Sequence, residues 1–448
     1  MKAKWKPLSQ TKTKEKILDI TSFKTTTNIT DEMGSRKGRS PFKTFTSWPD
    51  KPERIFVLSN DHLGLAYRDT AETDKIKIFD CDIAFYGGNF YNGGEYDIVE
   101  IWSNSHNMLT TIFPATIDDC LAIYSDSTYS MSPGHWAHSY LAYHNGRIFA
   151  AKRNTNYVNG YQEGDYVWQN MRQLTFYVGG DKAQCTGLTS FKGNLIYFSN
   201  HSFYAITILT TKTKGKDSNN QDYEIIEDVV TQDKVASDIG CISNYTIQNV
   251  SGNLIWLDNN GVYSWDGKNN PKMISAPIND DLDNLKQNTL WTKPQAYAIG
   301  GKYYLTILTT DSQGKTFVYN TDTKQWTTLE YETPLISLTV YDGKLLGLAT
   351  DAKIYALEQD NTDEVIPWSL ELEIDETASI LDVYAQKSPN ATIKAALIVD
   401  GVQIQELTNV NDNFTIPINL IPPKSDSIIK LYGEGEILFK KIILKQTT

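Results

Sequence analysis

Tyr140-Leu141-Ala142-Tyr143, followed after the turn residues Asn145-Gly146 by Arg147-Ile148-Phe149-Ala150-Ala151, is the stretch that most clearly indicates the fold of this 448-residue chain. Two runs of β-forming residues flank a two-residue turn, which is the sequence pattern of a β-hairpin. Apolar and aromatic residues alternate beside such turns, as in Leu195-Ile196-Tyr197-Phe198, and this pattern predicts hairpins with one buried face.

The turn signal recurs at steps of roughly 40 to 60 residues, each time between two runs of β-forming residues. A period near this length with two hairpins per unit is typical of a four-stranded propeller blade. We therefore expect an all-β fold containing a β-propeller of about six or seven blades. The recurring turns are His144-Asn145-Gly146-Arg147, Lys192-Gly193-Asn194, Ser251-Gly252-Asn253, Gly300-Gly301-Lys302 and Asp342-Gly343-Lys344.

Changes in composition divide the chain into three parts. We expect an extended basic arm over residues 1–53, the propeller over residues 54–360, and a small β-sandwich module over residues 366–448. Within the propeller, the polar segment 210–222 predicts an inserted loop, and residues 279–286 predict one short helix with Asn279 as its N-cap.

Charge is unevenly distributed along the chain. Residues 1–54 carry thirteen Lys or Arg and six Asp or Glu, whereas the whole chain has 42 and 54, a formal net charge of −12. The arm lacks a regular hydrophobic period, so it is expected to be extended on its own, either as a solvated tail or bound to a partner. That partner would be an acidic neighbouring subunit or the phosphates of nucleic acid.

Apolar residues in the arm favour docking on protein. Trp5, Ile17, Leu18 and Phe23 have no role in a purely electrostatic tether, so we take them as the candidate assembly residues. Docking on phosphates alone would instead weaken steeply as salt rises.

Composition sets limits on the class of protein. Aromatic residues make up 12% of the chain, with 26 Tyr and 10 Trp, which favours strands over helices. No run of about 18 apolar residues is present to span a membrane, and the basic N-terminus lacks the apolar stretch of a secretory signal. We expect the protein to be made in a cytoplasm and to stay there or leave it inside an assembly.

No motif indicates a metal, a cofactor or a catalytic centre. The four cysteines are too widely spaced for a zinc site or a disulfide framework, and we expect buried thiols. His135 and His138 form a weak metal pattern without a third ligand, and G-x-S-x-G and H-E-x-x-H are absent. The cysteines are Cys81, Cys120, Cys185 and Cys241.

The chain is therefore expected not to be an enzyme. Some propellers are glycosidases that place two carboxylates across a sugar, and residues 310–317 are faintly similar to the Asp-box of sialidases. The glycine of this segment comes one residue late and no other repeat carries the motif, so a hairpin turn is expected. A carbohydrate-active propeller stays open as an alternative, as does a receptor-binding protein whose C-terminal sandwich holds a sugar. Exposed aromatic residues in loops, such as Trp102 and Trp168, would fit the second alternative.

An ordered series of turn and strand motifs runs through residues 143–150, 186–188, 240–247, 257–263 and 266–267. In this order, the region from about 139 to 285 resembles the propeller of tail nozzle and related tail structural proteins of tailed bacteriophages. The residues ending in Leu431-Tyr432-Gly433-Glu434-Gly435-Glu436-Ile437 resemble the β-sandwich that follows the propeller in such proteins. Since these motifs are turn and core signals, no functional residue is carried over from the family.

The resemblance implies a virion component that forms a homo-oligomeric ring around the channel for DNA exit. It implies contacts with other phage tail or head-to-tail connector proteins, and non-specific contact with DNA in the channel. It also implies assembly in the cytoplasm of a host bacterium and a final place in the virion tail. The alternative function is a carbohydrate-active or receptor-binding propeller that acts on host surface glycan.

Overall fold

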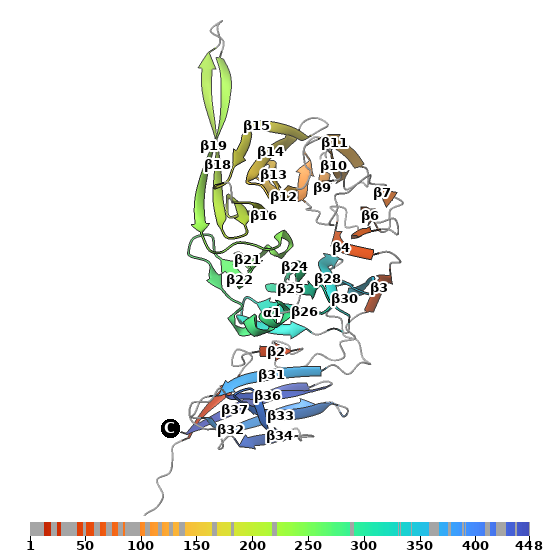
Figure 1. Ribbon diagram of the computed structural model, residues 1–448, viewed down its shortest axis with the longest axis vertical. Helices are drawn as coiled ribbons and strands as arrows, with labels where there is room; N and C mark the ends of the chain where they lie inside the picture. The colour runs from red at the N-terminus through yellow and green to blue at the C-terminus, as the bar shows by residue number, and fades with distance from the viewer. Residues whose placement is uncertain are drawn as a thin grey trace, which may run out of the picture. The chain divides into compact units, whose positions relative to one another are not determined.

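In the computed structural model (Figure 1), the described residues form mainly β-strands, with one short α-helix, so the all-β class predicted from the sequence is confirmed. The structure describes residues 13–18, 25–27, 43–47, 51–57, 63–68, 74–78, 84–85, 99–103, 108–114, 119–124, 129–133, 139–163, 168–180, 183–216, 222–286, 291–329, 331, 333–341, 343–357, 367–374, 378–387, 389, 391–407, 413–417, 427–434 and 437–447.

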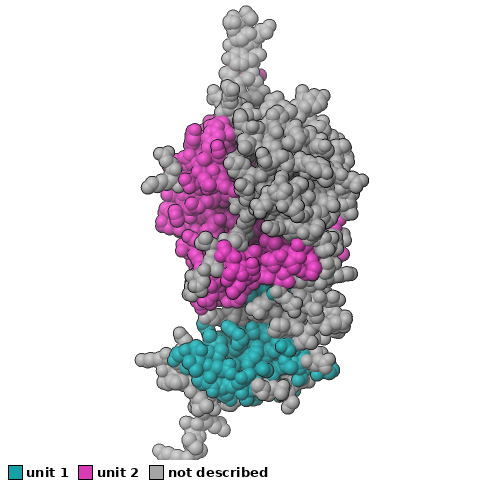
Figure 2. Space-filling view, turned by 45° about the vertical axis from the view of Figure 1, so that its right-hand side comes forward, with its two compact units in different colours: residues 1–43, 316–332, 358–448 teal, residues 44–315, 333–357 magenta. Residues whose placement is uncertain are grey.

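The chain forms two compact units, coloured separately in Figure 2. The larger unit contains residues 44–315 and 333–357. The smaller unit contains residues 1–43, 316–332 and 358–448. Each unit is therefore assembled from segments that are distant in the sequence.

Antiparallel sheets follow one another along the described part of the larger unit. Six of them have four strands, and a further pair is formed by β24 (Trp291–Ile299) and β25 (Lys302–Thr309). In chain order, the first sheet consists of β4 (Lys51–Val57), β5 (Leu63–Arg68), β6 (Asp74–Ile78) and β7 (Ala84–Phe85). The second consists of β8 (Val99–Ser103), β9 (Met108–Pro114), β10 (Asp119–Tyr124) and β11 (Tyr129–Pro133). The third consists of β12 (Ser139–His144), β13 (Arg147–Lys152), β14 (Tyr157–Glu163) and β15 (Trp168–Tyr177). The fourth consists of β16 (Cys185–Phe191), β17 (Asn194–Ser199), β18 (Phe203–Lys216) and β19 (Asp222–Ala236). The fifth consists of β20 (Gln248–Val250), β21 (Asn253–Asp258), β22 (Gly261–Trp265) and β23 (Lys272–Met273). The last four-stranded sheet consists of β28 (Leu335–Tyr341), β29 (Lys344–Ala349), β30 (Lys353–Ala356) and β3 (Lys43–Ser47).

Neighbouring sheets pack face to face, so some strands are buried on both sides. In β17, Leu195 and Tyr197 enter a core shared with the preceding sheet, whereas Ile196 and Phe198 enter a core shared with the following sheet. The expectation of one buried face was therefore wrong for this strand. A strand between two packed sheets has no solvent side, so consecutive residues along it are apolar.

The last sheet of the larger unit packs against the first. Leu346 and Leu348 of β29 share a core with Ile55 of β4 and Leu65 of β5. The backbone N–H of Ile55 also donates a hydrogen bond to Ser337 Oγ of β28, at 3.2 Å. The first and last sheets are thus joined by apolar packing and by hydrogen bonding.

The hairpin turns predicted from the sequence are confirmed where both central residues are described. Asn145 and Gly146 have φ angles of 48° and 79°, and Lys192 and Gly193 have φ angles of 47° and 80°. Positive φ at both central residues defines the type I′ turn, whose twist matches that of the two strands it joins. The same pattern occurs at Ser251-Gly252, Gly300-Gly301 and Asp400-Gly401.

The short helix predicted over residues 279–286 is confirmed as α1 (Asn279–Lys286). Asn279, however, is not an N-cap, because the 3-10 turn η3 (Ala276–Ile278) leads directly into it and its own backbone is helical. Its Oδ1 accepts a hydrogen bond from Ser275 Oγ at 2.7 Å. The side chain therefore holds the loop that precedes the helix.

The polar segment 210–222 was predicted to be a loop, which is wrong for residues 210–216 and 222, whereas residues 217–221 lie outside the described residues. β18 and β19 pair along their whole lengths, from Phe203 with Ala236 to Lys216 with Asp222. The two strands form a long ribbon whose outer end extends past the neighbouring strands in Figure 1. Threonine is common in strands despite its polarity, so the polar composition did not prevent β-structure here.

The smaller unit contains two sheets that bury one shared core. One sheet has the order β1-β37-β32-β35, and the other includes β27-β2-β31-β36-β33-β34. Alternate residues of β31, such as Trp368, Leu370 and Leu372, meet Ile442 and Leu444 of β37 in this core, which is the packing of a β-sandwich. The strands are β1 (Thr13–Leu18), β2 (Thr25–Thr27), β27 (Gln325–Leu329), β31 (Pro367–Ile374), β32 (Ala378–Lys387), β33 (Thr392–Val399), β34 (Val402–Leu407), β35 (Asn413–Pro417), β36 (Ser427–Glu434) and β37 (Ile437–Thr447).

Three strands of the expected arm, residues 1–53, pair within this chain. β1 pairs with β37, β2 lies between β27 and β31, and β3 lies beside β30. The two units also depart from the expected boundaries, because residues 316–332 group with the C-terminal residues. Thr25-Thr26-Thr27 shows no alternation that would predict a strand, and it pairs because two neighbouring strands offer free edges.

Candidate functional site

A cavity lies where the first strands of several sheets of the larger unit meet. It has a volume of about 310 Å³ and is lined by residues of β4, β12, β16, β20, β24 and β28 and of the 3-10 turn η2 (Asn244–Thr246). β28 contacts β4, β24 contacts β28, and β12 contacts β16, which brings the first strands side by side (Figure 1). Its volume is at the small end of the range for ligand pockets.

Four of the lining strands contain a β-bulge close to the cavity. A bulge changes the direction in which the following side chains point, and bulges are frequent beside functional sites. The register shifts lie between Pro52 and Arg54 in β4, Cys185 and Gly187 in β16, Thr292 and Gln295 in β24, and Leu335 and Ser337 in β28. Arg54, Leu188, Gln295 and Leu338, at or just after these shifts, line the cavity.

The described lining contains one charged side chain, that of Arg54. Its guanidinium carbon lies 4.2 Å from the centroid of the Tyr245 ring, which is a cation–π geometry. Gln295 and Thr339 also line the cavity, and they are only 5% and 2% exposed. No Asp or Glu belongs to the described lining, so a guanidinium is combined there with neutral polar groups.

Hydrogen bonds between neighbouring sheets fix the wall of the cavity. The backbone N–H of Leu188 donates to Asn244 Oδ1 at 2.9 Å. Gln248 Nε2 donates to the carbonyl oxygen of Ala296 at 3.1 Å. Both hydrogen bonds are partly buried, so the partner left behind when one breaks is only partly accessible to water.

The described lining lacks the pair of carboxylates that glycoside hydrolysis uses. The segment 310–317 begins as the hairpin turn that was expected there. The backbone N–H of Thr309 donates to the carbonyl oxygen of Gln313 at 2.8 Å. The cavity can therefore bind a molecule through hydrogen bonds and charge, but its described residues do not supply acid–base chemistry for a sugar.

His144 and Ser190 form a second polar pair, between β12 and β16. His144 Nδ1 lies 2.9 Å from Ser190 Oγ, and burial lowers the pKa of His144, so its imidazole is neutral at pH 7. Its Nε2 is buried without a hydrogen-bond partner among the described residues. A nucleophilic serine needs a base that is held by a third group, so we assign this pair a structural role.

The described residues include no group of three or more His, Cys, Asp or Glu placed to hold a metal ion. Cys185 and Cys241 are buried free thiols, as expected. Cys120 lies in β10, and Cys81, His135 and His138 lie outside the described residues. In the same part of the chain, no helix is long and apolar enough to cross a membrane.

Two of the four candidate assembly residues are described by the structure. Ile17 and Leu18 lie in β1, where they pair with Ile443 and Ile442 of β37. Trp5 and Phe23 lie outside the described residues. Trp102 and Trp168, the candidates for sugar contact, lie in β8 and β15.

Sequence reasoning missed the cavity residues Arg54, Gln295 and Thr339. One signal was present for Gln295, because Pro294 lies in a run that contains the β-forming residues Trp291, Thr292 and Tyr297. Proline inside such a run marks an edge or a bulge, and Pro294 lies at the bulge that precedes Gln295. No comparable signal marks Arg54 or Thr339.

Comparison with known proteins gives no family. No protein-family model matches the chain, and no curated protein matches it. Among solved structures it is similar to BamB from Moraxella catarrhalis, with a TM-score of 0.39 and 9% identity over 70% of this chain and 99% of that one. It is also similar to the computationally designed Ika8 protein, with a TM-score of 0.35 and 9% identity over 70% of this chain and 98% of that one.

A third similar structure is the extracellular domain of the one-component system BT4673 from B. thetaiotaomicron, with a TM-score of 0.39 and 7% identity. That match covers 81% of this chain but only 44% of the other chain. We draw no function from similarities at this level.

Proposed function

We propose that this chain is a structural β-propeller protein without enzyme activity, located in the nozzle or a ring of a bacteriophage tail. The observation that carries the proposal is the packing of successive sheets face to face, with the last sheet against the first. In this proposal the sheets of the larger unit are seven blades, and their first strands surround the cavity. Such a body suits a rigid scaffold because each sheet is held by two others.

The resemblance to tail proteins supports the virion location. Its propeller motifs lie in three successive sheets, the one that begins with β12 and the next two, and in the segments that connect their strands, and they include the type I′ turn at Asn145-Gly146. The cavity has only the volume of a small-ligand site. The channel for DNA would therefore be formed between copies of the chain in a ring and not through one copy.

The arm contributes to assembly in this proposal. Other tail or connector proteins, or a neighbouring copy, are the expected partners, because the basic arm complements an acidic surface. Phosphates of DNA in the channel are a second surface for non-specific contact. Residues 2–12 precede β1, so they can reach a neighbour while β1 stays paired with β37.

Two deletions test the role of the arm. Removing residues 2–12 should leave the chain folded and lower its incorporation into particles, measured by quantifying the chain in purified virions. Removing residues 2–24 would also remove β1 and expose the edge of β37, so failure of that variant alone would not demonstrate docking. Normal incorporation of the 2–12 deletion would contradict the assembly role.

The virion location itself is tested by imaging particles that contain the chain, with a tag inserted at the Asp400-Gly401 turn. Tags in a ring at the end of the tail would support the proposal. Their absence from particles would refute it. Hydrolysis of host glycan by the purified chain would favour the carbohydrate-active alternative instead.

A further inference from the structure

We propose that the β18–β19 ribbon joins neighbouring copies of this chain, with β18 of one copy added as a strand to the outer edge of β19 in the next. Strand addition of this kind forms backbone hydrogen bonds along both edges. The contact rests on the proposed function only for the ring that it would close. It is tested on the purified chain, so its failure can be distinguished from failure of the virion location.

The ribbon has two edges that no other described strand pairs with. β19 is the last strand of its sheet, whose order is β16-β17-β18-β19. On the other side, β17 pairs with β18 only as far as Ile206. The ten pairs from Thr207–Thr231 to Lys216–Asp222 therefore form a two-stranded ribbon among the described strands (Figure 1). At about 3.3 Å per residue, this ribbon is about 30 Å long.

A ribbon of this length gains little stability from its own pairing. Isolated two-stranded hairpins are marginally stable in water, and a third strand or a packed face is needed for independent stability. The preceding sheet supplies such packing at the base, where Arg147 contacts Asp228. Beyond Tyr204 the pairing of the two strands is regular, and no proline interrupts either strand. Both edges are therefore suited to accept a strand from a neighbouring copy.

An apolar pair is exposed on one face near the base of the ribbon. Leu209 and Val229 are opposite each other in the pairing and are 57% and 48% exposed. Ile208, the preceding residue, is only 7% exposed, because successive side chains of a strand point to opposite faces. In a sheet continued into the next copy, Leu209 of one copy would lie beside Val229 of its neighbour. Apolar pairs of this kind stabilise a sheet.

The charges of the two strands decide which edges pair. Residues 207–216 of β18 include three lysines and no acidic residue, whereas residues 222–231 of β19 include four acidic residues and no basic one. Like charges on adjacent strands are unfavourable, so pairing of β18 with β18, or of β19 with β19, is opposed. Pairing of β18 with β19 is favoured by charge. The charged residues are Lys212, Lys214 and Lys216 in β18, and Asp222, Glu224, Glu227 and Asp228 in β19.

A contact between two different edges can link more than two copies. Each copy offers one β18 edge and one β19 edge, which is a heterologous interface, and such interfaces close into rings when the rotation between copies allows it. If the ribbons run along the axis of the ring, Lys214 of one copy is level with Glu224 of the next. These two positions also pair within one copy. The pairing that forms the ribbon would thus be repeated between copies.

The test exchanges the charges of the two strands. Paired positions within one copy still carry opposite charges in the exchanged chain, so its ribbon should form. Between an exchanged and an unchanged copy, however, every β18–β19 contact would bring like charges together. The substitutions are Lys212→Glu, Lys214→Glu, Lys216→Glu, Asp222→Lys, Glu224→Lys and Glu227→Lys.

We expect the unchanged chain and the exchanged chain each to associate with themselves in sedimentation velocity, and less so as salt rises. The two chains are then labelled with different fluorophores and mixed. Affinity between the two kinds, measured by energy transfer, should be at least about tenfold lower than within each kind. A monomeric unchanged chain, or free mixing of the two kinds, would overturn the proposal.

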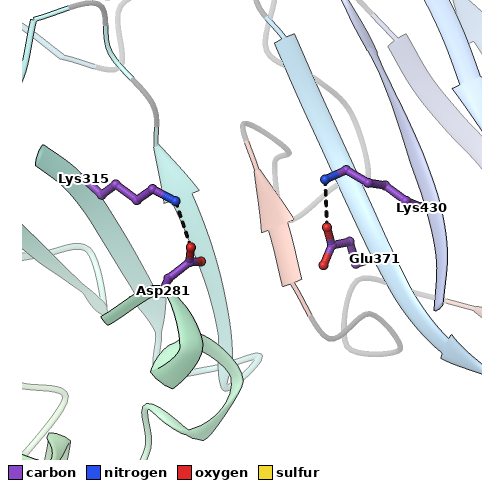
Figure 3. Close-up of polar contacts among 4 residues, drawn as sticks. All are labelled: Asp281, Lys315, Glu371 and Lys430. Carbon is purple, nitrogen blue, oxygen red and sulfur yellow. Dashed lines mark hydrogen bonds and ion pairs between the residues drawn. The ribbon is translucent and has the colours of Figure 1, made fainter. Parts of the chain in front are cut away.

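The matched control exchanges an ion pair outside the ribbon. Lys430→Glu with Glu371→Lys reverses the pair drawn in Figure 3, whose Nζ and Oε1 atoms are 2.9 Å apart. This variant should mix freely with the unchanged chain. Its failure to mix would show that the energy-transfer measurement does not report ribbon pairing, and would contradict the proposal.

A shortened ribbon gives a second, independent measurement. An Asn-Gly turn in place of residues 212–226 connects Thr211 to Glu227, which are opposite each other in the pairing. The ion pair between Arg147 and Asp228 is kept. Once circular dichroism has shown that the variant is folded, its dissociation constant for self-association should be raised at least about tenfold. Association as strong as that of the unchanged chain would refute the ribbon contact.

Discussion

Ser337 joins two sheets that lie at opposite ends of the larger unit's sequence. It is fully buried, and its Oγ accepts a hydrogen bond from the backbone N–H of Ile55. Ser337→Ala would leave that N–H buried without its partner. We expect the free energy of unfolding to fall by about 1–3 kcal/mol, measured by urea denaturation.

The matched control is Ser237→Ala, at an exposed position after β19. Water can take the place of an exposed serine hydroxyl, so the free energy of unfolding should change by no more than about 0.5 kcal/mol. Equal effects of the two substitutions would mean that the link between the first and last sheets contributes nothing to stability.

The buried thiol of Cys241 predicts that the free energy of unfolding depends on pH in the alkaline range. Burial raises the pKa of its thiol to about 12 from an ordinary value of 9.0, although hydrogen bonds with the backbone of Ser243 and the side chain of Thr246 oppose the shift. Above pH 9 the unfolded chain loses this proton while the folded chain keeps it. Stability is therefore fully present below pH 9 and falls as pH rises toward 12, by at most about 1.4 kcal/mol per pH unit.

Urea denaturation at several pH values between 8 and 11 measures this slope. Cys241→Ala should have a lower free energy of unfolding at pH 8, because a cavity is created. Above pH 9, however, its free energy of unfolding should fall less steeply with pH than that of the unchanged protein, because up to one titrating proton has been removed. An unchanged slope would show that Cys241 does not titrate differently in the two states. In the folded protein at pH 8, the Cys241 thiol should not react with a thiol reagent.

At the scale of elements, an ion pair secures the base of the β18–β19 ribbon. Arg147 Nη1 of β13 lies 2.9 Å from Asp228 Oδ1 of β19, and the side chains are 14% and 0% exposed. Thr210 Oγ1 also donates to Asp228 Oδ1, at 2.6 Å. Arg147→Met would leave a buried carboxylate without its cation, and we expect a loss of about 3–5 kcal/mol in the free energy of unfolding.

Two further variants separate charge burial from a simple loss of packing. Adding Asp228→Leu to Arg147→Met removes the unpaired carboxylate and should restore much of the lost free energy of unfolding. In the Lys315–Asp281 pair of Figure 3, each side chain is about one third exposed. Lys315→Met should therefore lower the free energy of unfolding by no more than about 1 kcal/mol. A similar loss for Arg147→Met and Lys315→Met would contradict the role of burial.

Elements with their own local pattern were predictable from the sequence. The type I′ turns need residues that tolerate positive φ, and Asn145-Gly146 shows this directly. The end of the ribbon was not predictable from composition, because Thr and Lys suit either a loop or an exposed strand. β2 depends on the edges of β27 and β31, which are far away in the sequence.

The cavity was harder to predict for the same reason. Arg54, Gln295 and Thr339 are more than 40 residues apart and meet only because the sheets succeed one another in space. No local sequence pattern indicates that these three residues line the same cavity. Pro294, at the bulge before Gln295, gave a partial signal for one of the three residues.

At the scale of the whole molecule, both units depend on strands from the N-terminal region. The core of the smaller unit is built from residues between Trp368 and Leu444, so the C-terminal segment contains the apolar residues it needs. Its sheet edges are covered by other segments, with β1 on β37 and β2 on β31. Such edges are sites of self-association when they are uncovered.

A fragment of residues 358–448 should therefore fold but associate with itself. Its core is complete, whereas the edges of β37 and β31 are left open. Sedimentation velocity should detect dimers or larger species that increase with concentration. Joining residues 10–30, which contain β1 and β2, to the same fragment through a flexible linker should cover these edges and shift it toward monomer. A monomeric fragment without residues 10–30 would contradict this prediction, and an unfolded fragment would show that the N-terminal strands stabilise the unit as well as cover it.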